Sequence, residues 1–160
     1  MLEGKIIVRE ATDKDIAKIV DIFKQSFTGS YRYWSIRDLR YTYNIVAEIN
    51  GQIVGAAELY CRYLEGLGDI GVIYFLAVKP SFRRKGVGKE LVKVAENIFF
   101  IWKCDYAAAS TTSDNKASIN LFKKMGYKVL DRKSAEKMGL IYTLYAFEDD
   151  VFFLKKLRQP

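Results

Sequence analysis

The stretch Arg83-Arg84-Lys85-Gly86-Val87-Gly88 holds the residue types best suited to binding chemistry in this chain. Its glycines let backbone N–H groups turn toward one point, and its three cationic side chains surround that point. A helix predicted to begin after the basic residues adds partial positive charge from its N-terminus. We therefore predict a phosphate-binding loop, with an ordinary basic surface loop as the alternative.

Two common phosphate-binding motifs do not fit this loop. Walker A requires a glycine five residues before Gly88 and a serine or threonine two residues after it, where the chain has Arg83 and Glu90. The dinucleotide-binding motif, counted from Gly86, requires glycine or alanine at the position of Leu91. The phosphate expected here therefore belongs to another class of ligand.

A buried strand and an amphipathic helix must position the loop. Residues 72–78 are apolar on both faces, as in a central strand covered by helices, and Pro80 ends the run. After the loop, apolar residues recur every three or four positions and predict a long helix: Val87, Leu91, Val94, Ala95, Ile98 and Trp102.

The first part of the chain predicts one strand and two helices. Ile6–Arg9 is a short apolar strand, and Thr12 with Asp15 forms the pattern of a capping box. Apolar residues follow at helical spacing: Ile16, Ile19, Val20, Phe23 and Phe27. A second, weaker helix is predicted for residues 35–43.

A β-hairpin follows these helices. Asn50-Gly51 suits the two positive φ angles of a type I′ turn between strands predicted at 45–49 and 53–59. Counting outward from that turn pairs Tyr43 with Glu58.

The C-terminal part predicts a further helix among strands. Tyr106–Thr111 is strand-like, and Ser113 or Asp114 can cap a helix that Gly126 ends. Three more strand-like stretches are Tyr127–Leu130, Leu140–Phe147 and Val151–Leu157. Because strands and helices interleave, we predict an α/β fold with a mixed sheet.

Two motifs in this order resemble those of the GCN5-related N-acetyltransferase (GNAT) superfamily. The first is Arg/Gln-x-x-Gly-x-Gly/Ala after a strand that ends in Leu-Ala-Val, matched by residues 76–88. The second, Asn-x-x-Ala-x-x-Leu-Tyr followed by Gly-Phe, is matched at Asn115, Leu121, Phe122, Gly126 and Tyr127. The resemblance covers nearly the whole chain. It implies one N-acetyltransferase domain, residues 1–160, with a mostly antiparallel sheet of about seven strands flanked by about four helices.

The resemblance also implies acetyl-CoA as acetyl donor and no metal. Backbone groups of the central strand would bind the pantetheine arm, amides of the phosphate loop would bind the pyrophosphate, and Asn115 would contact the cofactor from its helix start. A simple helix-start role is the alternative for Asn115. The implied cofactor-binding residues are Leu76, Ala77, Val78, Arg83, Arg84, Lys85, Gly86, Val87, Gly88, Lys89, Asn115, Ser118 and Phe122.

The usual acid and base of the family are missing here. Transfer to an amine requires that the amine lose its proton, and many family members use a carboxylate on the buried strand or on the next one. Those positions hold Val72 and Ser110, and Phe122 replaces the tyrosine proposed to protonate the CoA thiolate. Water could protonate that thiolate instead, since a thiol with a pKa of about 8.5 is a fair leaving group.

Glu58 is the first candidate for the base. Hairpin counting places it on an apolar face with Val54 and Ala56, where burial would make it more basic. Tyr74 is the second candidate. A solvated acid at a strand end and a core tyrosine are the alternatives, and other candidates for the base are Asp69, Tyr142 and Tyr145.

Composition and charge limit the classes of substrate and partner that we expect. The net charge of +7 disfavours polycationic acceptors, and no basic–aromatic motif accompanies it, so we expect an amine-bearing peptide or small molecule and no nucleic acid. The loop and the segment Tyr145–Asp150 resemble the protein N-terminal acetyltransferase branch. Tyr142, Tyr145 and Phe147 suit an acceptor groove or strand packing equally. A non-catalytic CoA-binding module is the alternative function.

The remaining signals concern location and redox chemistry. The chain has no histidine, which excludes histidine triads and histidine metal ligands. Cys61 and Cys104 stand alone and are expected to be small hydrophobic residues rather than a disulfide or a zinc site. No apolar run is long enough to cross a membrane and no signal peptide is evident, so we expect a cytoplasmic protein, monomer or homodimer, that does not bind membranes.

Overall fold

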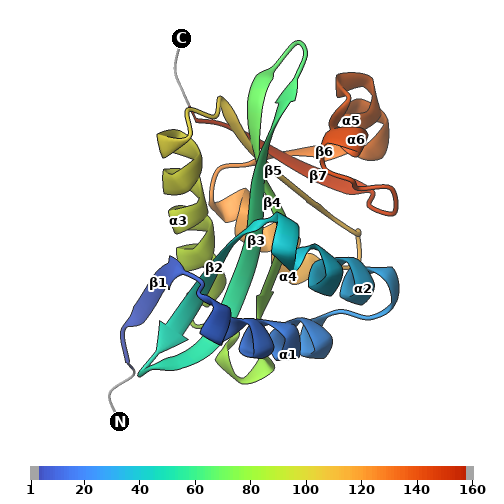
Figure 1. Ribbon diagram of the computed structural model, residues 1–160. Helices are drawn as coiled ribbons and strands as arrows, with labels where there is room; N and C mark the ends of the chain where they lie inside the picture. Colours follow the sequence, from blue (N-terminus) through green and yellow to red (C-terminus); the bar gives the residue numbers. More distant parts are fainter. Residues whose placement is uncertain (1–3, 158–160) are drawn as a thin grey trace. The chain divides into compact units, whose positions relative to one another are not determined.

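The computed structural model describes residues 4–157 and contains one seven-stranded sheet in the order β1-β2-β3-β4-β5-β7-β6 (Figure 1). The strands are β1 Ile6–Glu10, β2 Tyr43–Ile49, β3 Gln52–Leu64, β4 Gly68–Val78, β5 Tyr106–Thr111, β6 Lys128–Asp131 and β7 Val151–Lys156. The pairs β1–β2, β2–β3, β5–β7 and β6–β7 are antiparallel, whereas β4–β5 is parallel. The predicted mixed, mostly antiparallel sheet is confirmed.

Six α-helices accompany the strands within the described residues, where about four were expected. They are α1 Ile16–Ser26, α2 Gly29–Arg37, α3 Val87–Ile101, α4 Lys116–Lys124, α5 Arg132–Met138 and α6 Leu140–Thr143. Three short 3-10 helices are η1 Asp13–Asp15, η2 Asp38–Tyr41 and η3 Pro80–Phe82. Within residues 4–157, every helix is too short or too polar to serve as a transmembrane span.

The chain divides into two compact units. The first unit consists of the chain up to Leu59 together with Phe75–Val94, and the second consists of Tyr60–Tyr74 and the chain from Ala95 onward. Strands β3 and β4 and helix α3 each contribute residues to both units.

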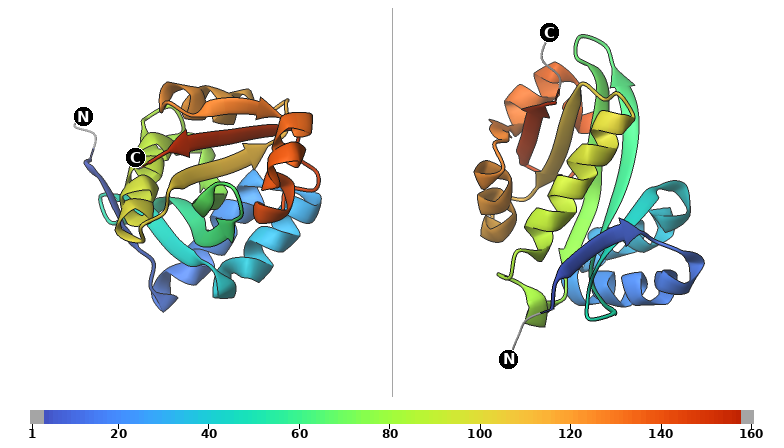
Figure 2. Two further views of the ribbon diagram at one scale, coloured as in Figure 1. Left: turned by 90° about the horizontal axis from the view of Figure 1, so that it is seen from above. Right: turned by 90° about the vertical axis from the view of Figure 1, so that its left-hand side faces the viewer.

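Helix α1 closes the core of the first unit. Its buried residues Ile19, Ile22 and Phe23 pack with Val46, Ile53, Ala56 and Ala77 of the strands, and α1 and α2 lie beside these strands in Figure 2. The first turns of α3 also pack on β3: a Cβ on Gly55 would lie 3.0 Å from Val87 and 3.2 Å from Leu91. The glycine therefore lets the helix that follows the basic loop approach the sheet closely.

The hairpin forms as predicted, but its register changes along its length. Asn50 and Gly51 have φ angles of 51° and 78°, as a type I′ turn requires. A bulge between Ala47 and Glu48 then shifts the pairing by one residue. The prediction that Tyr43 pairs with Glu58 is therefore wrong: Tyr43 pairs with Leu59, and Asn44 pairs with Glu58.

The weak second helix was predicted too late in the chain. The structure has α2 at Gly29–Arg37 and then the 3-10 turn η2, instead of one helix over residues 35–43. Only Ser35 of α2 is fully buried, so its sequence has little apolar periodicity. A tertiary contact holds it instead, because Arg32 Nε donates 2.8 Å to the carbonyl of Phe27 at the end of α1.

The strand predicted at Leu140–Phe147 is also wrong, because α5 and α6 occupy residues 132–143. Asp131 caps α5 by accepting 2.8 Å from Ser134 N, and Gly139 ends it with φ +85°. In α6, Leu140 and Ile141 enter a core with Ile70, Val72, Phe152 and Leu154. A short helix buries adjacent residues that a half-exposed strand would place on opposite faces.

Candidate active site

The basic loop joins β4 to α3 in the first unit, as predicted. Its Arg83 side chain fixes the start of the loop, because Nε donates 3.0 Å to the Val78 carbonyl and Nη2 donates 3.3 Å to Ser26 Oγ on α1. The amide of Lys79 donates 2.8 Å to the Val54 carbonyl. Arg83 therefore positions the loop, and its guanidinium is already engaged within the protein.

The backbone then opens toward solvent ahead of α3. Arg84 and Gly86 have φ angles of +62° and +87°, and a Cβ added to Gly86 would meet no atom within 4 Å. Glu90 N donates 3.1 Å to the Gly86 carbonyl, which begins the helix. The amides of the first helical turn have no carbonyl one turn earlier to bind. This open, cationic helix start has the chemistry that suits a phosphate group, and phosphate binding here stays a prediction.

The end of β4 carries the backbone groups expected to meet the pantetheine arm. Ala77 is buried in the core of the first unit, whereas Leu76 is half-buried. The Val78 carbonyl already accepts from Arg83. Contact between these residues and a cofactor stays a prediction.

The second predicted motif lies in the second unit. Asn115 caps α4, in place of the expected Ser113 or Asp114: its Oδ1 accepts 3.2 Å from Ser118 N, and its Nδ2 donates 3.1 Å to Thr111 Oγ1. The helix-start role is thus present, and a cofactor contact stays a prediction for Asn115 and Ser118.

Phe122 is part of the core of the second unit. Its side chain is buried, stacked on Phe153 at 4.7 Å between ring centroids and in edge contact with Tyr127 at 5.0 Å. The position where the family commonly has a tyrosine therefore holds a packed ring without a hydroxyl group.

Glu58 is fully buried in the first unit. Its Oε1 accepts 2.9 Å from Thr42 Oγ1, and its Oε2 has no hydrogen-bond partner among the described residues. Burial raises its pKa from 4.5 to about 8, with a smaller contribution from Asp38, while the Thr42 hydrogen bond opposes the rise. The alternative of a solvated acid is wrong, and Glu58 holds its proton at neutral pH.

The Thr42 hydroxyl has several acceptors within reach. Its Oγ1 also lies 3.1 Å from the Asp38 carbonyl and 3.0 Å from Asn44 Oδ1. One hydroxyl hydrogen cannot serve three acceptors at once. Thr42 therefore shares its hydrogen between Glu58 and these two groups, and its bond to Glu58 does not offset the effect of burial on the Glu58 pKa.

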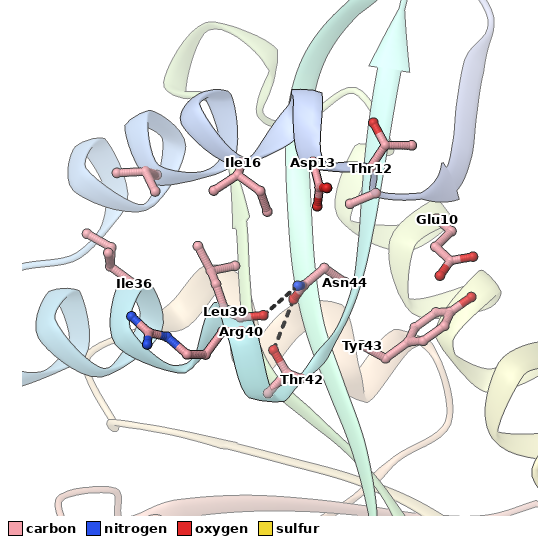
Figure 3. Close-up of a pocket in the computed structure, with 12 residues that line it drawn as sticks. Glu10, Thr12, Asp13, Ile16, Ile36, Leu39, Arg40, Thr42, Tyr43 and Asn44 are labelled. Atoms are coloured by element: carbon pink, nitrogen blue, oxygen red, sulfur yellow. Dashed lines mark hydrogen bonds between the residues drawn. The ribbon is translucent and has the colours of Figure 1, made fainter.

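A cavity of about 570 Å³ lies beside Thr42 in the first unit (Figure 3). Ile16, Ile36 and Leu39 supply its apolar wall, and Glu10 and Tyr43 lie at one side. Thr42 also lines it, and its hydroxyl contacts Glu58. None of the residues that line this cavity was predicted to bind the cofactor.

A second buried carboxyl group was missed by the sequence analysis. Asp149 is 7% exposed and accepts 2.6 Å from Ser110 Oγ on β5, and Arg132 donates 2.6 Å to its backbone carbonyl. Burial raises the pKa of Asp149 to about 6, and the neighbouring Asp150 adds to the rise. Ser110 is one of the positions where the family commonly has a carboxylate. The fold thus brings the carboxyl group of Asp149 next to Ser110, a position where the sequence itself has no acid.

Tyr74, the second candidate base, lies in an aromatic cluster of the second unit. Its ring centroid is 5.5 Å from that of Tyr60 and 6.2 Å from that of Tyr145. Tyr60 donates 2.7 Å to the Thr143 carbonyl, which fixes one side of the cluster. The core-tyrosine alternative fits this packing, and a catalytic role for Tyr74 stays a prediction.

The remaining residues predicted for the acceptor groove or as the base lie outside the core or far from the loop along the strand. Tyr142, Tyr145 and Phe147 are 73%, 52% and 55% exposed, so strand packing does not explain them. Tyr145 also has a φ angle of +52°, a strained conformation for a bulky residue. Asp69 lies at the opposite end of β4 from the loop, with its backbone amide donating 2.9 Å to Asp105 Oδ2.

Known proteins are similar to this chain in sequence. Residues 14–127 match the acetyltransferase (GNAT) family. An uncharacterized N-acetyltransferase of Methanocaldococcus jannaschii is 31% identical over 141 residues, which cover 82% of this chain and 83% of that protein. N-alpha-acetyltransferase 30 of Xenopus laevis is 25% identical over 123 residues, which cover 75% of this chain and 45% of that protein.

A solved structure shows the same fold. The NatC complex bound to Gag peptide and CoA has a chain that superposes with a TM-score of 0.69 at 21% identity, covering 94% of this chain and 96% of that one. The family match extends over most of the sequence and includes the basic loop and Asn115. The chain therefore belongs to the GNAT family and is an N-acetyltransferase, in a family that typically uses acetyl-CoA.

Proposed function

We propose that this chain moves the acetyl group of acetyl-CoA directly to a primary amine, at a protein N-terminus or on a small molecule, and that residues 1–160 act as one domain. The observation that carries the proposal is the open loop before α3. It combines positive φ angles at Arg84 and Gly86 with an exposed cationic surface and a helix N-terminus. The family match at 14–127 includes residues of both units.

The loop would hold the pyrophosphate of the donor. Amides from Arg84 to Lys89 would bind its oxygens, and the side chains of Arg84 and Lys89 would balance its charge. Backbone groups of Leu76 and Val78 would bind the pantetheine arm.

The chemical step needs one proton acceptor. The amine nitrogen attacks the thioester carbon, the carbon–sulfur bond breaks, a carboxylate takes the amine proton, and the departing thiolate takes a proton from water. Glu58 remains our first candidate for that carboxylate, and its pKa of about 8 restricts it to alkaline pH. Asp149, with a pKa of about 6, is already ionised at neutral pH and is the competing candidate.

The two candidates predict different pH profiles. With Glu58 as base, kcat/KM rises through a pKa near 8, and Glu58→Gln removes that limb and lowers kcat at neutral pH. With Asp149 as base, the limb lies near pH 6 and disappears in Asp149→Asn. A limb that survives in both variants belongs to the amine substrate, whose own pKa is about 8 for an α-amino group.

Of these two acceptor classes, we propose the peptide N-terminus. The exposed rings of Tyr142, Tyr145 and Phe147 offer apolar surface for a peptide side chain. The similarity to N-alpha-acetyltransferase 30 and to the peptide-bound NatC complex supports the same class. Thiol release from acetyl-CoA, measured with short peptides bearing free N-termini and with small amines, identifies the class. Release with small amines alone would contradict the peptide assignment.

The cofactor site is tested by Gly86→Asp. The new carboxylate would stand in the open space where the pyrophosphate is expected, and calorimetry should show acetyl-CoA affinity reduced by at least about tenfold. Gly51→Asp is the matched control, because Gly51 lies in the same unit, also has positive φ and also faces open space. Unchanged affinity in a folded Gly86→Asp protein would show that the loop does not bind the donor.

A further inference from the structure

The two cysteines of the chain meet in the second unit, although 43 positions separate them. Cys61 lies on β3 and Cys104 follows the end of α3, and their Sγ atoms are 3.1 Å apart. The sequence analysis predicted that the two cysteines stand alone, and the contact between them corrects that part of the prediction; both are free thiols in this structure. A disulfide bond is about 2.05 Å long, so the sulfurs need to approach by only about 1 Å.

The backbone fixes Cys104 on its side of the contact. Lys103 adopts a left-handed conformation with φ +64°, and the Cys104 amide donates 2.9 Å to the Phe99 carbonyl of α3. The next residue, Asp105, donates 2.7 Å to the Asp69 carbonyl at the start of β4. Cys104 is therefore held between the end of a helix and the edge of a strand.

The two thiols differ in their access to solvent. Cys104 is fully buried, whereas Cys61 is exposed. Burial raises the pKa of the Cys104 thiol, and Cys61, Asp69 and Asp105 add to the rise. A small oxidant from solvent therefore meets Cys61 first, and Cys104 is placed to react in the second step.

We propose that Cys61 and Cys104 are a redox modification site that closes to an intramolecular disulfide when a peroxide oxidises the protein. Hydrogen peroxide converts the Cys61 thiol to a sulfenic acid and releases one water. The Cys104 sulfur then attacks the Cys61 sulfur, the sulfur–oxygen bond breaks, and the hydroxyl group leaves with the Cys104 proton as a second water. In total two thiols lose two electrons and two protons, and the peroxide is reduced to two waters.

The test uses the reduced full chain treated with hydrogen peroxide. Because the chain has two cysteines in all, the titratable thiol count under denaturing conditions should fall from two to zero. The intact mass should fall by two hydrogens, a Cys61–Cys104 cross-linked peptide should appear, and a dithiol reductant should reverse each change. The cross-link should also raise Tm by roughly 5–15 °C, since it closes a long loop in the unfolded chain.

Two variants separate the steps. Cys104→Ala should stop at the sulfenic acid, which dimedone traps on Cys61. Cys61→Ser changes an exposed position and should leave the buried thiol of Cys104 unreacted under the same treatment.

Any of three results would overturn the proposal. The first is persistence of both thiols in the folded wild-type chain, and the second is oxygen addition there without loss of two hydrogens. The third is a disulfide that forms only between molecules. None of these readouts depends on acetyl transfer, so they are independent of the function proposed above.

Discussion

Glu58→Gln is expected to change the pH dependence of stability, because this buried carboxyl group is neutral in the folded protein. The pKa of Glu58 is about 8 in the folded state, against 4.5 for an ordinary glutamic acid. Between these values the unfolded chain releases a proton that the folded chain retains. The free energy of unfolding therefore falls as pH rises, by up to about 1.4 kcal/mol for each pH unit.

The full effect follows from the two pKa values. Below pH 4.5 Glu58 is protonated in both the folded and the unfolded state, so it contributes nothing to the pH dependence. Above about pH 8 the loss of unfolding free energy is complete, at roughly 4–5 kcal/mol. Glutamine has the same shape and does not titrate. We expect Glu58→Gln to be close to the wild type in stability at pH 5 and more stable by several kcal/mol at pH 9.

Urea unfolding followed by tryptophan fluorescence at several pH values measures this difference. Glu65→Gln is the matched control, because Glu65 is exposed and its loss removes the same charge without burial. Its curve should stay close to that of the wild type at every pH. If the Glu58→Gln curve also runs parallel to the wild type from pH 5 to 9, Glu58 ionises normally in the folded protein and our explanation of its burial is wrong.

Two further substitutions test the second unit. Asp149→Asn keeps a hydrogen-bond acceptor for Ser110 but cannot accept a proton. With Asp149 as the base, kcat falls at pH 7 while the Kd for acetyl-CoA, measured by calorimetry, stays the same; equal loss of both would indicate a structural role. Gly71→Ala would drive a methyl group into the ring of Phe99 and should cost about 1–3 kcal/mol in urea unfolding. The second change Phe99→Leu should recover part of that loss, and strictly additive effects would contradict the contact.

The sequence by itself determined the elements whose signals are local. Asn50-Gly51 favours a type I′ turn because these two residue types tolerate positive φ angles, whatever packs against the turn, and the structure has those angles. The basic loop could be located from its own glycines and from the change between strand-like and helical periodicity around it. The family motifs lie on these same local elements, so the residue pattern alone is enough to locate the basic loop between its strand and its helix.

Only the tertiary structure decided the partners and the burial of side chains that contact distant segments. The bulge between Ala47 and Glu48 moved Glu58 to a new partner, and its depth of burial set its pKa. No periodicity distinguishes Asp149 from its acidic neighbours, and only the pairing of β5 with β7 brings it to Ser110.

The same limit applies to the two cysteines. Cys61 and Cys104 contact each other only because α3 ends where β3 passes within the second unit. The order of apolar and polar residues along a segment predicts its secondary structure. It does not show which distant segment will cover a given side chain and exclude water from it. Protonation, proton transfer and thiol chemistry depend on that removal of water, so these properties had to come from the folded chain.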